Sequence, residues 1–199
     1  KTGNRVDPGN TVIKADKAEG DLPATVDDAR WGTIAPTTFY LVPQIIGKER
    51  YFLPSNDTIS VRAVYDDKRV ALLLEWDDRT RSIPGDEGAE KIADPPIAED
   101  GVAVQLPVAI PSGMEKPYFG MGDATHPVNV WHWKSGTKSA PQTVNLLASR
   151  GFKEIEKRDA AAVGLEAKAS YADGTWRVLM VRPLVTGEAD KDIQFAEGR

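Results

Sequence analysis

The sequence predicts a mainly β protein, an antiparallel β-sandwich with one short helix and long loops. Three observations indicate this class. About seven short segments are rich in β-branched and aromatic residues, turn residues separate them at short intervals, and strands do not alternate with helices. The length of 199 residues and the hydrophobic share of 41% match one globular domain. We therefore expect a polar N-terminal arm over residues 1–30 and a sandwich domain over residues 31–199.

The first strands are expected between residues 38 and 76. Residues 38–46 are β-branched and aromatic, and Pro43 among them favours a sheet edge or a bulge. Residues 58–65 alternate apolar and polar side chains, and after a short turn residues 69–76 are apolar on both faces. This pair predicts a β-hairpin whose second strand is central in a sheet.

A long polar segment follows the hairpin. Residues 77–100 are rich in Asp, Glu and Pro, which predicts a solvated loop, with an acidic docking surface as the alternative. Residues 101–110 resume strand character and end near two prolines, and residues 128–133 form another short apolar segment. Both of these segments predict strands.

One helix and one further hairpin complete the predicted elements. Residues 139–148 begin with a serine and a nearby proline, carry apolar residues at helical spacing and end before Gly151, which predicts the helix. An Asp-Gly pair joins apolar segments over residues 165–171 and 176–184. That pair is a strong signal for a tight turn between two antiparallel strands.

The composition excludes several classes of function. A net charge of −5 argues against a nucleic-acid binder, which needs a basic face to displace counterions from phosphates. The absence of cysteine excludes thiolate chemistry, iron–sulfur ligation and covalent c-type haem attachment by this chain. No apolar run approaches the 18 or so residues that a membrane span needs, so we expect no membrane span.

Motifs of common enzymes and ligand-binding modules are weak. Residues 120–123 lack the G-x-G-x-x-G pattern, no G-x-S-x-G pattern occurs, and the acidic pairs lie where they stabilise turns. No catalytic residue is therefore predicted. Trp131, Trp133 and Trp176 would form an aromatic platform for a carbohydrate, with buried packing as the alternative.

The most unusual segment runs from residue 114 to residue 134. It concentrates two of the three methionines, both histidines and two of the five tryptophans, and it places Met121 between two glycines. A thioether between residues without a Cβ can approach a large planar ligand closely, which suits an axial haem ligand. A methionine in a loop also serves as a packing residue, and both interpretations stay open on these grounds.

This segment resembles the signature of a known family. Residues 117–122 (PYFGMG) and 128–134 (VNVWHWK) are similar to the haem b-binding γ subunits of periplasmic molybdenum enzymes of the dimethyl sulfoxide reductase superfamily. These enzymes include ethylbenzene dehydrogenase, dimethyl sulfide dehydrogenase, selenate, chlorate and nitrate reductases, and nitrite oxidoreductase. Further landmarks follow in the family's order: residues 20–23 (GDLP), 29–31 (ARW), 43–46 (PQII), 61–67 (VRAVYDD), 73–78 (LLEWDD) and 176–184 (WRVLMVRPL).

The resemblance implies a β-sandwich that holds one noncovalent haem b between its sheets, with Met and Lys as the axial pair. Met121 matches the methionine position. The family's lysine lies near the C-terminus, after a segment that would follow residues 194–195. We therefore expect that lysine beyond Arg199 and an incomplete C-terminal end. Lys134 and Lys168 are in-chain alternatives that do not match the family's site.

Four other residues are candidates for the haem pocket. We expect Phe119, Trp131 and Trp133 to form its walls. Arg182 lies on the same alternating side of its strand as Trp176 and neighbouring apolar residues. It is expected either to meet a haem propionate or to be a surface charge at the end of the strand.

The function that the resemblance implies is electron transfer without bond-making chemistry in this chain. Electrons would pass between a molybdopterin α subunit, an iron–sulfur β subunit, the haem b and a soluble c-type cytochrome. The implied location is the periplasm or another extracytoplasmic compartment. Two rival interpretations are a haemless module that binds carbohydrate or another ligand, and a haemless structural subunit.

Overall fold

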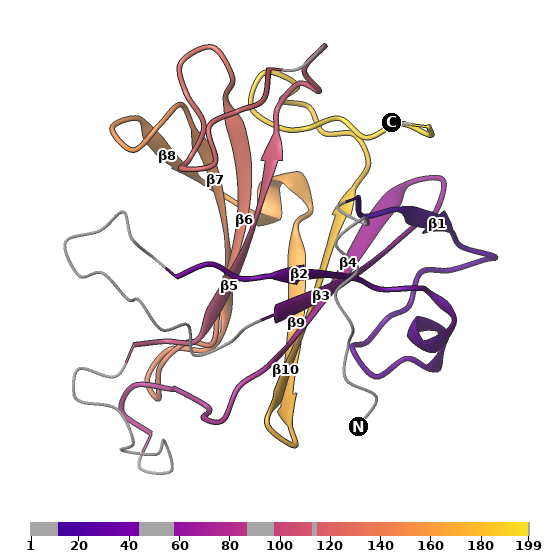
Figure 1. The fold of residues 1–199 in the computed structure, drawn as a ribbon, viewed down its shortest axis with the longest axis vertical. Coiled ribbons are helices and arrows are strands. Elements are labelled where there is room, and N and C mark those ends of the chain that lie inside the picture. Colours follow the sequence, from indigo (N-terminus) through magenta and orange to yellow (C-terminus); the bar gives the residue numbers. More distant parts are fainter. Residues whose placement is uncertain (1–11, 44–57, 87–97, 113–114, 199) are drawn as a thin grey trace. The chain divides into compact units, whose positions relative to one another are not determined.

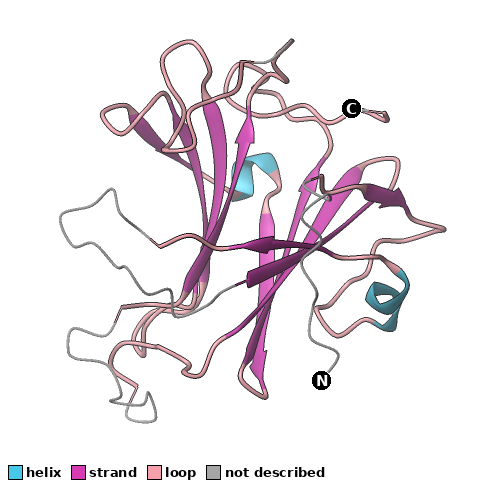
Figure 2. Ribbon diagram, in the orientation of Figure 1, coloured by secondary structure: helices cyan, strands magenta, loops and turns pink. Residues whose placement is uncertain are grey.

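The computed structural model describes residues 12–43, 58–86, 98–112 and 115–198 (Figure 1). Within these ranges the chain forms ten strands and two short 3₁₀ helices (Figure 2), so the predicted mainly β class is confirmed. The elements are β1 (Ala15–Lys17), η1 (Ala29–Thr33), β2 (Thr37–Tyr40), β3 (Thr58–Tyr65), β4 (Arg69–Asp77), β5 (Gly101–Pro107), β6 (Val128–Lys134), β7 (Thr143–Ser149), β8 (Ile155–Arg158), η2 (Ala161–Val163), β9 (Glu166–Ala172) and β10 (Thr175–Pro183).

The chain divides into two compact units. Unit 1 comprises Lys1–Asp66, Val70–Arg81 and Lys168–Met180, and unit 2 comprises Asp67–Arg69, Ser82–Ala167 and Val181–Arg199. The predicted division at residue 30 stays a prediction.

The sheet that lies mainly in unit 1 has the strand order β1-β3-β4-β10-β9, and β2 also pairs with β3. The hairpin of β3 and β4 is confirmed, with Ser60 opposite Glu75 and Tyr65 opposite Val70. β4 lies between β3 and β10 and is buried along both faces, as its continuous apolar run predicts. β2 confirms the start of the predicted first strand, and residues 44–46 lie outside the described residues.

The N-terminal arm is part of unit 1 and packs on its sheet more closely than the polar composition of the arm suggests. Apolar side chains buried in and just after the arm are Leu22, Val26, Trp31 and Ile34. Three basic side chains of the sheet bind this segment, through Arg62 to Ile34 O, Lys168 to Ala24 O and Arg177 to the Asp27 carboxylate, each at 3.0 Å. β1 was not predicted, because its three residues are all exposed and show no alternation.

The sheet of unit 2 is antiparallel in the order β5-β6-β7-β8. Successive residues of β6 point to opposite faces of this sheet. We call one face the Trp131 face, because it carries Asn129, Trp131 and Trp133. The other is the Gln105 face, because Gln105 is opposite Val130 in the β5–β6 pair and Ser149 is opposite Val128 in the β6–β7 pair.

The predicted helix over residues 139–148 is wrong. These residues instead contribute to β7, which pairs along the whole of β6 from Lys134 opposite Thr143 to Val128 opposite Ser149. Without β7, the backbone N–H and C=O groups along that edge of β6 would lose their partners, a cost that outweighs weak local helix signals. β8 was also unpredicted, since most of its side chains are exposed.

The Asp-Gly turn between β9 and β10 is confirmed. Asp173 has φ 53° and Gly174 has φ 71°, so both central residues are left-handed, as a type I′ turn requires. The described parts of the predicted loop over residues 77–100 contain no strand after β4, and residues 87–97 lie outside the described residues.

Replacing Gly174 by alanine should destabilise the hairpin. An L-residue in the left-handed region costs about 1–2 kcal/mol, and the added Cβ would lie 3.3 Å from the Asp78 carbonyl oxygen. Urea unfolding should show a loss of about that size. Gly187→Ala is the control, because a Cβ added at position 187 would have no neighbouring heavy atom within 4 Å. Equal stabilities of the two variants would contradict the prediction.

Candidate functional site

Residues 117–127 form a loop, here called the Met121 loop, that lies on the Gln105 face of the unit-2 sheet. The Met121 N–H donates to Gln105 Oε1 at 3.1 Å, and Met121 O accepts from Ser149 Oγ at 2.8 Å and from Gly151 N at 2.9 Å. Gln105 is on β5 and Ser149 is on β7, so strands on both sides of β6 hold the Met121 peptide groups.

The backbone of Met121 is left-handed, with φ 70°, and Gly122 follows with φ 71°. Such a conformation is unfavourable for a residue with a side chain, and it persists only where surrounding contacts impose it. A Cβ on Gly122 would lie 2.8 Å from His126 O, and one on Gly120 would lie 2.6 Å from the Tyr118 ring. The two glycines are therefore needed for packing within the loop, a role beyond the close ligand approach predicted from the sequence.

Asp123 organises the turn after Met121. Its carboxylate accepts hydrogen bonds from Thr125 Oγ1 at 2.7 Å and from the Thr125 and His126 amides at 2.9 Å each. The Thr125 hydroxyl bond is the largest cause that holds the pKa of Asp123 well below its ordinary value. The ring Nδ1 of His126 is 3.1 Å from Asp123 Oδ1, so this histidine belongs to the same turn.

Exposed aromatic side chains lie in the loop and beside it. Phe119 is 71% exposed, its ring centroid is 4.6 Å from that of Tyr118, and the Phe152 ring lies beside Gly120. A pocket of about 530 Å³ adjoins Ser149, which itself binds Met121 O. Its lining combines apolar, basic and acidic residues: Val108, Pro127, Val128, Ala148 and Ile155; Arg150, Lys153 and Lys191; and Glu154, Glu156 and Asp190.

The opposite face of the sheet carries Trp131 together with Arg182. The Arg182 Cζ lies 5.1 Å from the Trp131 ring centroid, and the Arg182 side chain is fully buried. It donates to Ile193 O at 2.5 Å and to Pro183 O at 3.0 Å. Burial lowers the pKa of Arg182 to about 10, which leaves it charged at neutral pH. The alternative that Arg182 is a surface charge is therefore wrong, and its role toward a propionate stays a prediction.

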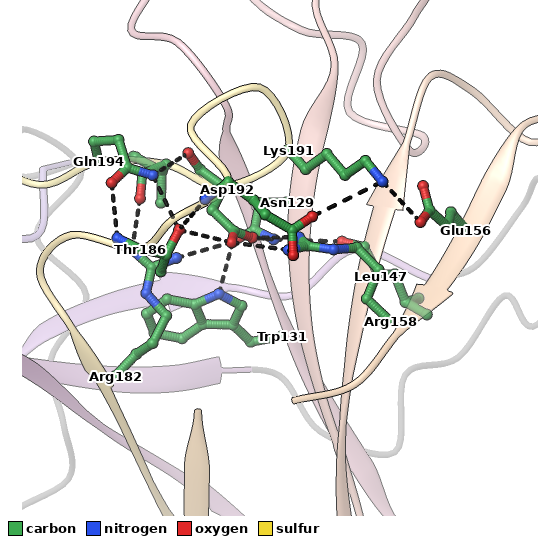
Figure 3. Close-up of polar contacts among 12 residues, drawn as sticks. Asn129, Trp131, Leu147, Glu156, Arg158, Arg182, Thr186, Lys191, Asp192 and Gln194 are labelled. Carbon is green, nitrogen blue, oxygen red and sulfur yellow. Dashed lines mark hydrogen bonds and ion pairs between the residues drawn. The ribbon is translucent and has the colours of Figure 1, made fainter. Parts of the chain in front are cut away.

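Arg182 belongs to a buried polar group that we call the Asp192 cluster, made of Asn129, Arg158, Arg182, Thr186 and Asp192 (Figure 3). The Asp192 carboxylate accepts from Arg158 at 2.5 and 3.0 Å, from Asn129 Nδ2 at 3.0 Å and from Thr186 Oγ1 at 2.9 Å. Asn129 Oδ1 in turn accepts from Trp131 Nε1 at 2.8 Å. Within the part of the chain that the structure describes, no buried side-chain N or O atom lacks a partner.

The remaining predicted residues are dispersed. Trp133 is buried on the Trp131 face, and its Nε1 donates to Gln142 Oε1. Lys134, at the far end of β6 from Val128, forms an ion pair with Glu99 at 3.0 Å. Of the predicted residues, the structure brings Trp131 and Arg182 together and Phe119 beside Met121, but it puts these two groups on opposite faces of one sheet. Their roles toward a haem stay predictions.

The tryptophans do not form an exposed platform for a carbohydrate. Trp131, Trp133 and Trp176 are at most 4% exposed, so the interpretation of buried packing is confirmed. Trp176, in unit 1, stacks on Trp76 with ring centroids 6.3 Å apart.

Sequence reasoning missed Gln105 and Ser149, which hold Met121, and Arg150, Phe152 and Lys153, which lie around the loop. Gln105 and Ser149 are far from Met121 in sequence and belong to no chemical motif. Their proximity follows from the β5-β6-β7 pairing, and β7 was itself predicted as a helix.

Comparison with known proteins identifies the family to which the chain belongs. Residues 28–162 match the family model described as ethylbenzene dehydrogenase, and the chain belongs to this family. It is 27% identical over 189 residues to a Haloferax mediterranei protein described as a respiratory nitrate reductase haem subunit, covering 95% of this chain and 62% of that protein. It is 31% identical over 144 residues to chlorate reductase subunit gamma of Ideonella dechloratans, covering 70% of this chain and 52% of that protein.

This chain therefore spans between half and two thirds of the length of these two relatives. A crystal structure of a Bacteroides uniformis protein described as carbohydrate-binding aligns with a TM-score of 0.46 and 10% identity over 88% of this chain and 72% of that chain. A likeness of this strength supports no argument about function.

Replacing Asp192 by alanine should strongly destabilise the protein. The change leaves Arg158, whose side chain is 6% exposed, without its buried partner, and breaking a buried pair costs about 3–5 kcal/mol. Urea unfolding of Asp192→Ala measures this loss. The control is Lys191→Ala, which removes only partly exposed ion pairs, those with Glu156 and Glu188, and should have little effect. If the two variants unfold at the same urea concentration, the cluster does not stabilise the fold.

Proposed function

We propose that this chain is a haem-carrying electron-transfer subunit of an oxidoreductase complex and binds one noncovalent haem b through Met121. The observation that carries the proposal is the left-handed Met121, whose peptide groups are held by Gln105 of β5 and Ser149 of β7. Ser149 also lines the adjoining pocket, whose walls carry apolar, basic and acidic residues. Membership of the family supports it, as do two relatives named as a haem subunit and a gamma subunit of reductases.

The residues around Met121 fit a haem. A thioether is a soft ligand that suits haem iron, and the pocket walls include Val108, Pro127 and Val128 for an apolar macrocycle. The basic residues Arg150, Lys153 and Lys191 in the same lining suit the two carboxylates of a haem, and the lining also carries the acidic residues Glu154, Glu156 and Asp190. A volume of about 530 Å³ lies within the usual range of small-molecule sites.

A bound haem supplies one-electron chemistry, because its iron changes between the ferric and ferrous states. The chain's own residues would set how readily this happens. The Met121 sulfur would favour the ferrous state, and the buried side chains Val128 and Val130 of the Gln105 face would keep water from one side of the site. We assign no catalytic residue to the chain.

The second axial ligand is proposed to be the lysine that the family resemblance implies beyond Arg199. Lys134 is a poor substitute for two reasons. It forms an ion pair with Glu99, and it lies about 20 Å along β6 from Val128, which is the residue of β6 next to the Met121 loop. Lys168 is engaged with Ala24 O in unit 1.

The proposed partners are an iron–sulfur subunit and a molybdopterin subunit of one complex, with a soluble c-type cytochrome as the exchange partner outside it. The names of the nitrate and chlorate reductase relatives support such a complex. The proposed location is the periplasm or another extracytoplasmic compartment. Among the described residues, no helix has the length and apolar character needed to cross a membrane.

An absorption spectrum of the full-length protein loaded with haem tests the proposal. The parent should give a six-coordinate, low-spin b-type spectrum. Met121→Leu, which removes the sulfur at similar volume, should give a high-spin spectrum and weaken haem binding by about tenfold or more. Met180→Leu makes the same change at a fully buried strand position and should leave the spectrum unchanged. A correctly folded protein that takes up no haem would overturn the proposal in favour of a haemless binding or structural module.

A further inference from the structure

Two uncharged side chains hold the Met121 peptide groups from opposite sides. Gln105 Oε1 accepts the Met121 N–H, while Gln105 Nε2 donates to Tyr118 O at 3.2 Å. Ser149 Oγ donates to Met121 O and also accepts from Gly151 N at 3.2 Å. The donor and the acceptor of Met121 are both satisfied by groups that the sheet holds in place.

We propose that Gln105 and Ser149 are positioning residues, which fix Met121 in its left-handed conformation and so set the strength of its sulfur–iron bond. This inference rests on the proposed function and extends it to two residues that are not ligands of the iron, although Ser149 also lines the proposed pocket. Gln105 and Ser149 are called the Met121 clamp below.

The clamp acts on a backbone that would otherwise relax. Met121 has φ 70°, in the left-handed region that is unfavourable for a residue with a side chain. Loss of the hydrogen bonds would let the Met121 backbone leave this region, and the direction of the Met121 side chain would change with it. The clamp also sets the loop on either side of Met121. Gln105 reaches Tyr118 O, which also accepts from Gly122 N at 2.9 Å, so one side chain ties both ends of the turn from Tyr118 to Gly122.

The position of the clamp is set by strand register. Gln105 is opposite Val130 and Ser149 is opposite Val128, so both side chains project from one face over the same stretch of β6. A one-residue slip of β5 or β7 would turn either side chain to the Trp131 face. The amide and the hydroxyl carry no charge near neutral pH, so their hold on Met121 does not change with pH there.

Hydrogen exchange and spectroscopy of clamp variants test the inference. In the haem-free full-length protein, Gln105→Ala should speed exchange of the Met121 amide. In the haem-loaded protein, Gln105→Ala and Ser149→Ala should each raise the ratio of high-spin haem, in which the Met121 sulfur has left the iron, to low-spin haem. The expected rise is about fivefold, because each variant loses one ordinary hydrogen bond. The double variant should raise the ratio further and lower the midpoint potential toward that of Met121→Leu.

Conservative variants separate positioning from general destabilisation. Ser149→Thr keeps a hydroxyl donor and should restore the low-spin spectrum. Gln105→Glu keeps an acceptor for the Met121 N–H but loses the donor to Tyr118 O, so it should restore Met121 amide protection only. The controls Asn145→Ala and Thr143→Ala alter β7 side chains of the Gln105 face at the end away from the loop, and they should change neither spectrum nor potential.

The outcomes distinguish the clamp from the haem site itself. If Met121→Leu changes the spectrum but the clamp variants match the controls, the positioning role is overturned and the proposed function stands. If the parent protein takes up no haem, the proposed function fails. The redox role of the clamp then fails as well, even if the clamp variants speed hydrogen exchange of the Met121 amide.

Discussion

The buried carboxylate of Asp192 and the guanidinium groups of Arg158 and Arg182 impose the strictest condition on unit 2. A buried charge is tolerated only when hydrogen-bond or ion-pair partners compensate for the lost water. The segment after Val181 must therefore pass close to the sheet, where Asn129 and Arg158 bind the buried Asp192 carboxylate. Asn129 links the Asp192 carboxylate to β6. Its side-chain NH₂ donates to Asp192, and its side-chain oxygen accepts a hydrogen bond from the Trp131 indole N–H. Polar groups thereby cover part of the Trp131 face, and no buried side-chain N or O atom among the described residues lacks a hydrogen-bond partner.

The same strand supports the candidate site on its other face. The Trp131 face is filled by packed and bonded side chains, whereas the exposed aromatic residues Tyr118 and Phe119 belong to the Met121 loop on the Gln105 face. The pocket adjoins Ser149 at the end of β7. The loop there has an unfavourable backbone conformation at Met121, which a rigid sheet can impose through Gln105 and Ser149. The buried charges and the Met121 peptide groups are therefore held on opposite faces of one sheet.

Local patterns predicted much of the fold. The hairpin of β3 and β4, the strands β5 and β6 and the Asp-Gly turn before β10 all have signals within a few residues, since alternation and left-handed turn residues are short-range properties. β1, β7 and β8 lacked such signals. β1 and β8 are mostly exposed, and β7 is a strand because β6 offers it an edge to pair with. For the site, Met121 was found by its flanking glycines and by the family pattern, whereas Gln105 and Ser149 were not.

The sequence by itself determined the mainly β class, the family and the methionine to test, because composition, alternation and an ordered series of motifs are all written along the chain. Only the tertiary structure decided that Arg182 is buried among partners, that Trp131 and Trp133 face away from the Met121 loop, and that two distant side chains hold Met121. The physical reason is that burial, face and hydrogen-bond partners depend on strand pairing, which joins residues across long separations in sequence.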